Sequence, residues 1–218
     1  MTPNKEDYLK ELYKLGGSNQ LVSNKQLSQA LNVAPASVSE MLNKLSQEGL
    51  LFITPYKGTI LSKEGLKIAI SLLRGHRLWE VFLIRHLGYT WSEAHEDAEL
   101  LEHISPARLT ERLDRFLNYP EYCPHGSIIP KADGHIKEDA LILLSELKKG
   151  ESSIIKKVQE EKSFLDYLQK QGIEIGGNVT VVSVGDYEGP FTLKLKDKII
   201  QISHKAACQI FVSDISDT

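Results

Sequence analysis

The segment from His95 to His103 brings several metal-ligating side chains onto one face of a predicted helix. At roughly 100° per residue, four of them share a sector about 100° wide: His95, Glu99, Glu102 and His103. Carboxylate and imidazole groups together suit a divalent first-row metal ion. The alternative interpretation of this pattern is a solvated acidic face with incidental histidines.

Three other places offer metal ligands, each with a simpler alternative. His76 and Glu80 stand at i and i+4 on the preceding predicted helix, where a helix ion pair is the alternative. Cys123-Pro124-His125 offers a thiolate and an imidazole, although a buried structural cysteine is common. Asp7 lies in the first turn of a helix, where the helix dipole alone favours an acid.

The N-terminal part of the chain predicts three helices and a hairpin. Apolar spacing predicts a helix over 4–16, and a capping box at Ser23 begins a second helix. Pro35 suits the first turn of a third helix that runs to about Gln47. The strand-like residues 50–61 turn at Gly58. This order predicts a winged helix-turn-helix.

The middle of the chain predicts further helices. A long helix is expected from about Lys63 to Leu87, another from about Thr90 to before Pro106, and a third over 106–118. A short helix is expected near 136–147.

The C-terminal part has a different residue pattern from the helical segments before it. The polar stretch 148–153 is interpreted as a hinge, and a helix is expected over 163–170. Short strands between Gly and Asp turns then predict a small β-barrel of the SH3 kind. The fold class is therefore mainly α with a small β domain. The expected domains are a DNA-binding domain over 1–64, a metal-binding and dimerisation domain over 65–147, and the SH3-like domain over 148–218.

The exposed face of the third predicted helix could contact DNA. Small and polar residues there permit close approach to the major groove, and they are Ala36, Ser37, Ser39, Glu40, Asn43 and Lys44. Lys25 and Lys57 are candidates for phosphate contacts. Such polar faces are commonly only solvated, which is the alternative for each residue.

Charge is unevenly distributed although the net charge is -3. Residues 1–77 hold 10 Lys/Arg and 6 Asp/Glu, whereas residues 78–145 hold 6 and 12, with five of the seven histidines. A mildly basic block that could meet phosphates thus precedes an acidic block that could hold a cation.

Composition excludes several classes of protein. No apolar stretch reaches the roughly 18 residues of a membrane-spanning helix, and the polar N-terminus lacks the apolar core of a secretion signal. Two cysteines, Cys123 and Cys208, exclude a disulfide framework. The expected location is the cytoplasm, with no membrane partner.

Together these residues resemble the iron- and manganese-dependent repressor family, the group of the diphtheria toxin repressor and the manganese transport regulator. The similarity runs over essentially the whole chain and is carried by four segments: Lys5-Glu6-Asp7-Tyr8-Leu9, Ala34 to Met41, Gly75 to Glu80, and His95 to His103. The C-terminal stretch resembles the small SH3-like domain, similar to ferrous transport protein A, of longer members. A generic winged helix has no reason to carry the two-helix metal face.

The resemblance implies two metal sites. The primary site, which controls DNA binding, would use Asp7, His76, Glu99, Glu102 and His103. The secondary site would use Glu80, Cys123, His125 and a carboxylate from the C-terminal domain, for which Glu160 is chosen over the adjacent Glu161, with His95 contributing.

Two departures from relatives bear on the metal. The iron-responsive branch has methionine and cysteine where this chain has Asp7 and Glu99, and hard carboxylates shift the preference toward Mn²⁺, with Fe²⁺ or Zn²⁺ as alternatives. Two-domain manganese regulators have a glutamate where this chain has Lys10, and a protonated lysine cannot coordinate. Their closely spaced metal pair is therefore not expected here.

The resemblance implies a repressor that binds an inverted-repeat, double-stranded operator as a homodimer when loaded with metal, and that represses metal-uptake genes. Dimerisation would use the apolar residues Leu109, Leu113, Phe116 and Leu117. A metal-dependent hydrolase is one rival, but Glu99 occupies the second histidine position of a His-Glu-x-x-His helix. A winged-helix regulator of an organic ligand is another, and it leaves the carboxylate–imidazole face unexplained.

Overall fold

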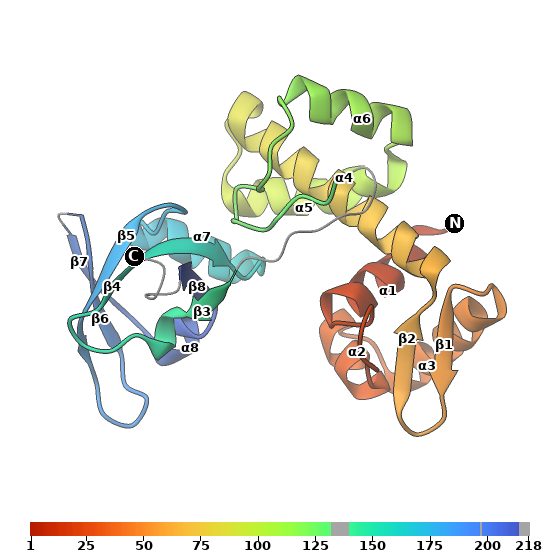
Figure 1. Cartoon of the computed structure of the whole chain (residues 1–218), viewed down its shortest axis with the longest axis horizontal. Coiled ribbons are helices and arrows are strands. Elements are labelled where there is room, and N and C mark those ends of the chain that lie inside the picture. The colour runs from red at the N-terminus through yellow and green to blue at the C-terminus, as the bar shows by residue number, and fades with distance from the viewer. Residues whose placement is uncertain (132–139, 197, 214–218) are drawn as a thin grey trace. The chain divides into compact units, whose positions relative to one another are not determined.

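The computed structural model describes residues 1–131, 140–196 and 198–213, and its elements are shown in Figure 1. The chain forms two compact units. Residues 1–76 and 100–111 belong to the first unit, and residues 77–99, 112–129 and the described residues from 140 onward belong to the second.

The first unit begins with three helices and a hairpin, as the sequence predicts. The elements are α1 (Pro3–Lys14), α2 (Asn24–Leu31), α3 (Pro35–Gln47), β1 (Leu51–Thr54) and β2 (Gly58–Leu61). The hairpin is antiparallel, and β1 contacts α3 (Figure 1). This is the predicted winged helix-turn-helix.

Local chemistry explains where these helices begin. Ser23 accepts a hydrogen bond from the backbone N–H of Gln26, and the Gln26 side chain bonds back to Ser23, so α2 starts with a complete capping box. Pro35 begins α3, where its missing N–H costs nothing. The buried leucines of α1, Leu9 and Leu12, join those of α2 and α3 in one core, which fixes α1 in this domain.

Three helices follow: α4 (Lys63–Leu87), α5 (Trp91–Ile104) and α6 (Ala107–Phe116). In the second unit, Leu78 and Val81 of α4 pack with Leu113 of α6 and with Leu117. Leu113 and Leu117 are thus core residues, and the prediction that they lie on a dimer surface is wrong. Their apolar side chains are buried against residues of the same chain, which explains the amphipathic spacing.

The C-terminal part forms a six-stranded antiparallel sheet. Its elements are β3 (Leu141–Leu143), the 3-10 turn η1 (Leu144–Glu146), β4 (Ser152–Val158), α7 (Lys162–Gln171), β5 (Asn178–Val184), β6 (Phe191–Leu195), β7 (Lys198–Ile202), α8 (His204–Ala207) and β8 (Ile210–Ser213). The strand order is β3-β8-β4-β5-β6-β7, with bulges in β4 and β5. Bulges of this kind bend a strand and increase its twist, as a small SH3-like sheet requires.

Two predictions made from the sequence differ from the structure in this region. The helix expected near 136–147 is wrong over 141–147, because the apolar run Leu141–Leu143 pairs with β8 and η1 follows it; residues 136–139 lie outside the described residues. Strand β4 begins at Ser152, inside the expected hinge. The sheet therefore includes residues that precede position 148.

Side chains attach α7 to the start of α5 within the second unit. The Ser92 hydroxyl donates to Asp166 at 2.5 Å, and the Trp91 backbone N–H donates to Gln169 at 3.1 Å. Lys162 pairs with Glu96 at 2.6 Å. These contacts fix the segment that precedes α7, which contains Glu160.

Within the described ranges, no helix combines the length and the apolar composition that crossing a membrane requires.

Two glycines of α4 give a matched test of packing. A Cβ at Gly65 would lie 1.9 Å from the Leu50 carbonyl oxygen, whereas a Cβ at Gly75 would meet nothing within 4 Å. We expect Gly65→Ala to lower the free energy of unfolding by about 1–3 kcal/mol, because the helix must move away from the hairpin. Gly75→Ala is expected to raise it by about 0.5–1 kcal/mol through lower chain entropy. Urea denaturation followed by circular dichroism measures both, and equal effects would contradict this account.

Candidate metal centres

The first cluster joins α1 to the C-terminal turn of α5. The Asp7 carboxylate oxygen Oδ1 lies 3.1 Å from His103 Nε2, and that nitrogen lies 3.5 Å from Glu102 Oε1. One ligand atom from each of Asp7, Glu102 and His103 lies within 4.8 Å of the others. The predicted ligands of the two helices are therefore brought together.

These separations fit a metal ion. Bonds of about 2.1 Å place neighbouring ligand atoms about 3.0 Å apart at right angles and about 3.4 Å apart in a tetrahedron. The observed 3.1 and 3.5 Å fall in this range. The Glu102 side chain is fully buried, and such a carboxylate needs positive charge nearby.

His76 also reaches this cluster. It is 1% exposed, and its Nδ1 lies 2.8 Å from Glu102 Oε2. This contact places an imidazole beside the buried carboxylate of the cluster. The role of His76 as a ligand stays a prediction.

Sequence reasoning missed the role of Glu6. Its Oε2 lies 2.7 Å from His103 Nδ1, where that nitrogen as N–H donates to Glu6, and the other ring nitrogen, Nε2, lies 3.1 Å from Asp7 Oδ1. A carboxylate that holds a ligating histidine in this way is the usual outer partner in metal sites. On sequence, Glu6 and Asp7 are adjacent acids in one helical turn, with nothing to separate their roles.

Glu99 also lies on α5, three residues before Glu102. Its Oε1 is 3.9 Å from His95 Nε2, one helical turn back. Its membership of the first cluster stays a prediction, which rests on helical spacing.

The second cluster is built around the buried carboxylate of Glu80. Glu80 Oε1 lies 3.0 Å from His95 Nδ1 and 3.1 Å from His125 Nδ1. Cys123 Sγ lies 3.9 Å from Glu160 Oε1. One ligand atom from each of Glu80, Cys123, His125 and Glu160 lies within 4.8 Å of the others, so α4, the 123–127 loop and the segment before α7 contribute together.

The loop of Cys123 and His125 is docked on β4. The Val158 backbone N–H donates to the His125 carbonyl at 3.0 Å. Gly126 has φ +83, and a Cβ there would lie 1.8 Å from the Lys156 carbonyl oxygen. A glycine is therefore required at this position for both its backbone conformation and its close approach.

The structure distinguishes Glu160 from Glu161. Glu160 accepts a hydrogen bond from the buried Ser127 hydroxyl at 2.7 Å, beside the other candidate ligands. Glu161 instead caps α7 by accepting from the Ser163 backbone N–H at 3.0 Å. Ser127, which positions Glu160, was missed because a lone serine in a loop carries no metal signal.

Burial strongly affects the Cys123 thiol. Desolvation, and then the negative charges of Glu80 and Glu160, hold the pKa of Cys123 well above its usual value, although Arg77 acts in the opposite direction. Without a bound cation the group is therefore a neutral thiol, and binding a metal as thiolate requires it to release its proton.

The candidate DNA contacts lie on the outside of the winged helix. The exposed ones are Lys25, Ala36, Ser37, Glu40, Asn43, Lys44 and Lys57. Ser39 is half-buried and accepts a hydrogen bond from Asn24 at 2.9 Å, so it ties α2 to α3. Lys44 pairs with Glu40 at 2.7 Å and lowers the pKa of that carboxyl. Tyr56, which the sequence analysis did not select, is fully exposed at the hairpin tip beside Lys57.

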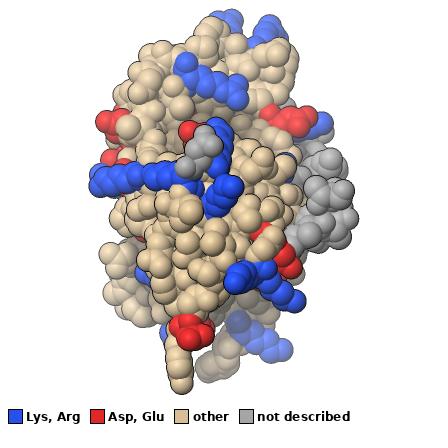
Figure 2. All heavy atoms as spheres, turned by 90° about the vertical axis from the view of Figure 1, so that its left-hand side faces the viewer, with Lys and Arg blue, Asp and Glu red and all other residues tan. Residues whose placement is uncertain are grey.

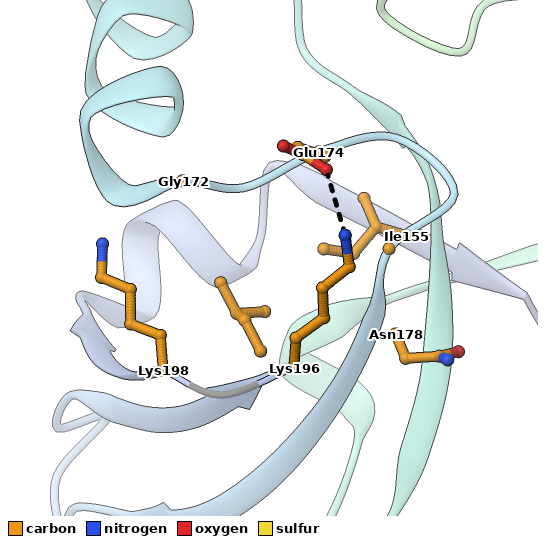
Figure 3. Close-up of a pocket in the computed structure, with 8 residues that line it drawn as sticks. Ile155, Gly172, Glu174, Asn178, Lys196 and Lys198 are labelled. Carbon is orange, nitrogen blue, oxygen red and sulfur yellow. Dashed lines mark ion pairs between the residues drawn. The ribbon is translucent and has the colours of Figure 1, made fainter.

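The C-terminal sheet contains a pocket of about 300 Å³ between α7, β4, β5 and the β6–β7 turn (Figure 3). Lys196 and Glu174 form an ion pair of 3.7 Å at this pocket. None of the candidate metal ligands lines it. Figure 2 shows the side of the molecule with this sheet, where basic side chains stand in separate groups on a mostly uncharged surface.

A winged helix with acid–histidine clusters on α1, α4 and α5 defines the class of metal-responsive DNA-binding proteins. Family models agree with this class. Residues 1–59 match the iron-dependent repressor N-terminal DNA-binding domain, residues 62–131 match the iron-dependent repressor metal-binding and dimerisation domain, and residues 142–214 match the FeoA domain.

Two solved structures cover nearly the full chain, and a curated relative covers most of it. The structure of ScaR with bound Cd²⁺ is 39% identical, covers 97% of this chain and 99% of its own, and has a TM-score of 0.83. A manganese-dependent transcriptional repressor in complex with manganese is 29% identical, covers 97% and 100%, and has a TM-score of 0.87. The iron-dependent repressor IdeR of Mycobacterium leprae is 26% identical over 81% of this chain and 82% of its own length.

The chain belongs to the iron-dependent repressor family. This membership confirms the predicted fold class and the predicted class of function, a DNA-binding repressor that depends on divalent metal. The family is not one of enzymes, so the hydrolase alternative is set aside.

The raised pKa of Cys123 predicts a pH-dependent second cluster. Below that pKa, the metal must displace the thiol proton, so we expect affinity to rise about tenfold per pH unit from this group. Cys123→Ser is expected to bind metal more weakly and to lose that part of the slope, because a serine hydroxyl stays protonated. Titration with Zn²⁺ against a competing chelator between pH 6.5 and 8.5 measures this. Identical slopes for the two proteins would contradict thiolate ligation.

Proposed function

We propose that this chain is a manganese-responsive repressor that binds an inverted-repeat operator as a homodimer when its first cluster holds a divalent ion. The observation that carries the proposal is the convergence of Asp7 from the DNA-binding domain with Glu102 and His103 of α5. A bound ion would supply a cross-link between these helices.

The residues then have distinct tasks. Asp7 brings the first helix to the cluster, and Leu9 and Leu12 of the same helix transmit its position into the core of the winged helix. Glu102 and His103 would bind the same ion from α5. Because α1 is packed rigidly in that core, fixing Asp7 fixes the orientation in which α3 is presented to DNA.

The ligand types favour Mn²⁺ at the first cluster. Asp7, Glu102 and, by its helical spacing, Glu99 supply carboxylate oxygens, and His76 and His103 supply imidazole nitrogens. Hard oxygen ligands suit Mn²⁺ better than thiophilic ions. The thiol of Cys123 makes the second cluster more tolerant of Zn²⁺ or Fe²⁺.

The DNA partner follows from the exposed face of α3. Ala36 and Ser37 at its N-terminal end are small enough for close approach to base edges, and Asn43 can hydrogen-bond to them. Lys25, Lys44 and Lys57 reach toward phosphates. A second copy of the chain would present a second α3 to the other half-site.

Exposed apolar residues support the homodimer. Phe116 is 62% exposed and Leu109 is 41% exposed on α6. These two side chains lie about two helical turns apart on α6, and a contiguous exposed apolar patch marks a candidate contact surface in a folded protein. Leu113, on the inner side of the same helix, holds α6 to the core instead.

Metal is expected to strengthen DNA binding through Asp7. An operator is first selected from a random duplex library with Mn²⁺-loaded protein, and affinity is then measured by fluorescence anisotropy with and without a chelator. We expect Mn²⁺ to raise affinity about 5–150-fold, the usual range of such coupling. Asp7→Ala is expected to remove this increase because α1 loses its ligand.

Glu64→Ala is the matched control for that experiment. It removes one exposed acidic charge from the same unit, outside the cluster, and is expected to keep the metal response. Operator affinity that is the same with and without Mn²⁺ in the unmodified chain would refute the proposal.

The dimer has its own test. We expect Phe116→Asp to shift the protein toward the monomer in sedimentation velocity, because a charge would be buried against the second copy. Val182→Asp, at a β5 position that is 38% exposed, is the control and is expected to leave the association unchanged. If the unmodified protein sediments as a monomer with Mn²⁺ present, the dimer is excluded.

A further inference from the structure

Lys10 is a buried lysine within the first cluster. It stands on α1 three residues after Asp7, and its side chain is only 4% exposed. Its ammonium nitrogen lies 2.5 Å from Glu102 Oε1. A lysine is rarely buried to this extent unless it is paired. The ion pair with Glu102 therefore accounts for the burial of Lys10 in the cluster.

The ammonium contacts an oxygen that the metal needs. Glu102 Oε1 is also the atom 3.5 Å from His103 Nε2, which in turn lies 3.1 Å from Asp7. The other oxygen, Oε2, lies 2.8 Å from His76 Nδ1. Of the two Glu102 oxygens, Oε1 is the one placed near His103, so a divalent ion that binds Asp7, His103 and this oxygen must share Oε1 with the ammonium or displace it.

We propose that the Lys10 ammonium pairs with Glu102 in the metal-free protein and competes with the metal ion for this carboxylate. Lys10 thereby sets the metal concentration at which the first cluster fills. This inference rests on the proposed metal binding at that cluster. Lys10 is not a ligand; it acts on the ion through Glu102 and through its own positive charge.

Electrostatics gives the direction of the effect. Without metal, a fully buried carboxylate beside Asp7 and Glu6 needs a counter-charge, and Lys10 supplies it. When the ion arrives, the same positive charge opposes it. Lys10 thus stabilises the empty cluster and weakens the loaded one, and both effects lower the affinity for metal.

The test removes the charge and keeps the length of the side chain. In a Cys123→Ser background, which weakens the second cluster, Lys10→Met is expected to bind Mn²⁺ at least about tenfold more tightly than the parent, since a close charge shifts such an equilibrium by tenfold or more. Affinity is measured by competition with a fluorescent chelator. Because its empty cluster lacks the counter-charge, Lys10→Met should also gain more in Tm on adding Mn²⁺ than the parent gains.

Two further variants complete the design. Lys14→Met removes an exposed lysine from the same helix and is expected to bind Mn²⁺ within about twofold of the parent, which separates the local charge from net charge. Lys10→Gln removes the charge but keeps a donor for Glu102, and it is expected to change affinity in the same direction as Lys10→Met, so the test does not depend on one variant that folds.

The outcomes separate this inference from the proposed function. If Asp7→Ala weakens Mn²⁺ binding but Lys10→Met and Lys10→Gln bind no more tightly than Lys14→Met, the role of Lys10 is wrong and the metal site stands. If Asp7→Ala has no effect on Mn²⁺ binding, the first cluster is not the metal site, and both proposals are refuted.

Discussion

The convergence of Asp7, Glu102 and His103 is the interaction on which the functional arrangement depends, because it joins side chains 95 and more residues apart in the sequence. Three acids and two imidazoles within contact distance cannot be placed there without positive charge. The ammonium of Lys10 supplies part of it. In the proposed function a divalent ion supplies the rest, and its binding would act directly on α1 of the DNA-binding domain.

The second cluster depends on a different constraint, which is the docking of the 123–127 loop on β4. Gly126 permits a backbone approach that no side chain would allow, and Ser127 then fixes Glu160. The cluster thereby requires the central helices and the C-terminal sheet to be folded together. Its neutral thiol must release a proton to bind a metal as thiolate, so we expect the occupancy of this cluster to depend on proton concentration.

The sequence predicts the helical parts of the fold well because their signals are local. The capping box at Ser23 and the proline at position 35 mark helix starts, and amphipathic spacing carries α4 through its full length. Strand β4 was missed because a bulge between Ile155 and Lys157 breaks the alternation that identifies a strand. Strand β3 is only three residues long and is defined by its pairing with β8.

The same distinction holds for the candidate sites. Residues that share a helix, such as Glu102 and His103, could be grouped from spacing alone. The roles of Glu6 and Lys10 depend on partners more than 90 residues away, and no local pattern separates them from ordinary surface charges. Glu161 shows the intermediate case, since its capping of Ser163 is local chemistry that in principle distinguishes it from Glu160.

Helix α1 belongs both to the core of the winged helix and to the first cluster, the two parts that a metal-dependent repressor must connect. Leu9 and Leu12 anchor one side of it in the winged-helix core, while Glu6, Asp7 and Lys10 face the cluster. A change in the partners of Glu102 therefore acts on a helix that is packed into the core of the DNA-binding domain. A flexible loop at this place could change its conformation without moving the domain. Linkage requires the converse as well: an operator that favours the bound orientation of α1 must raise the affinity of the cluster for metal by the same factor.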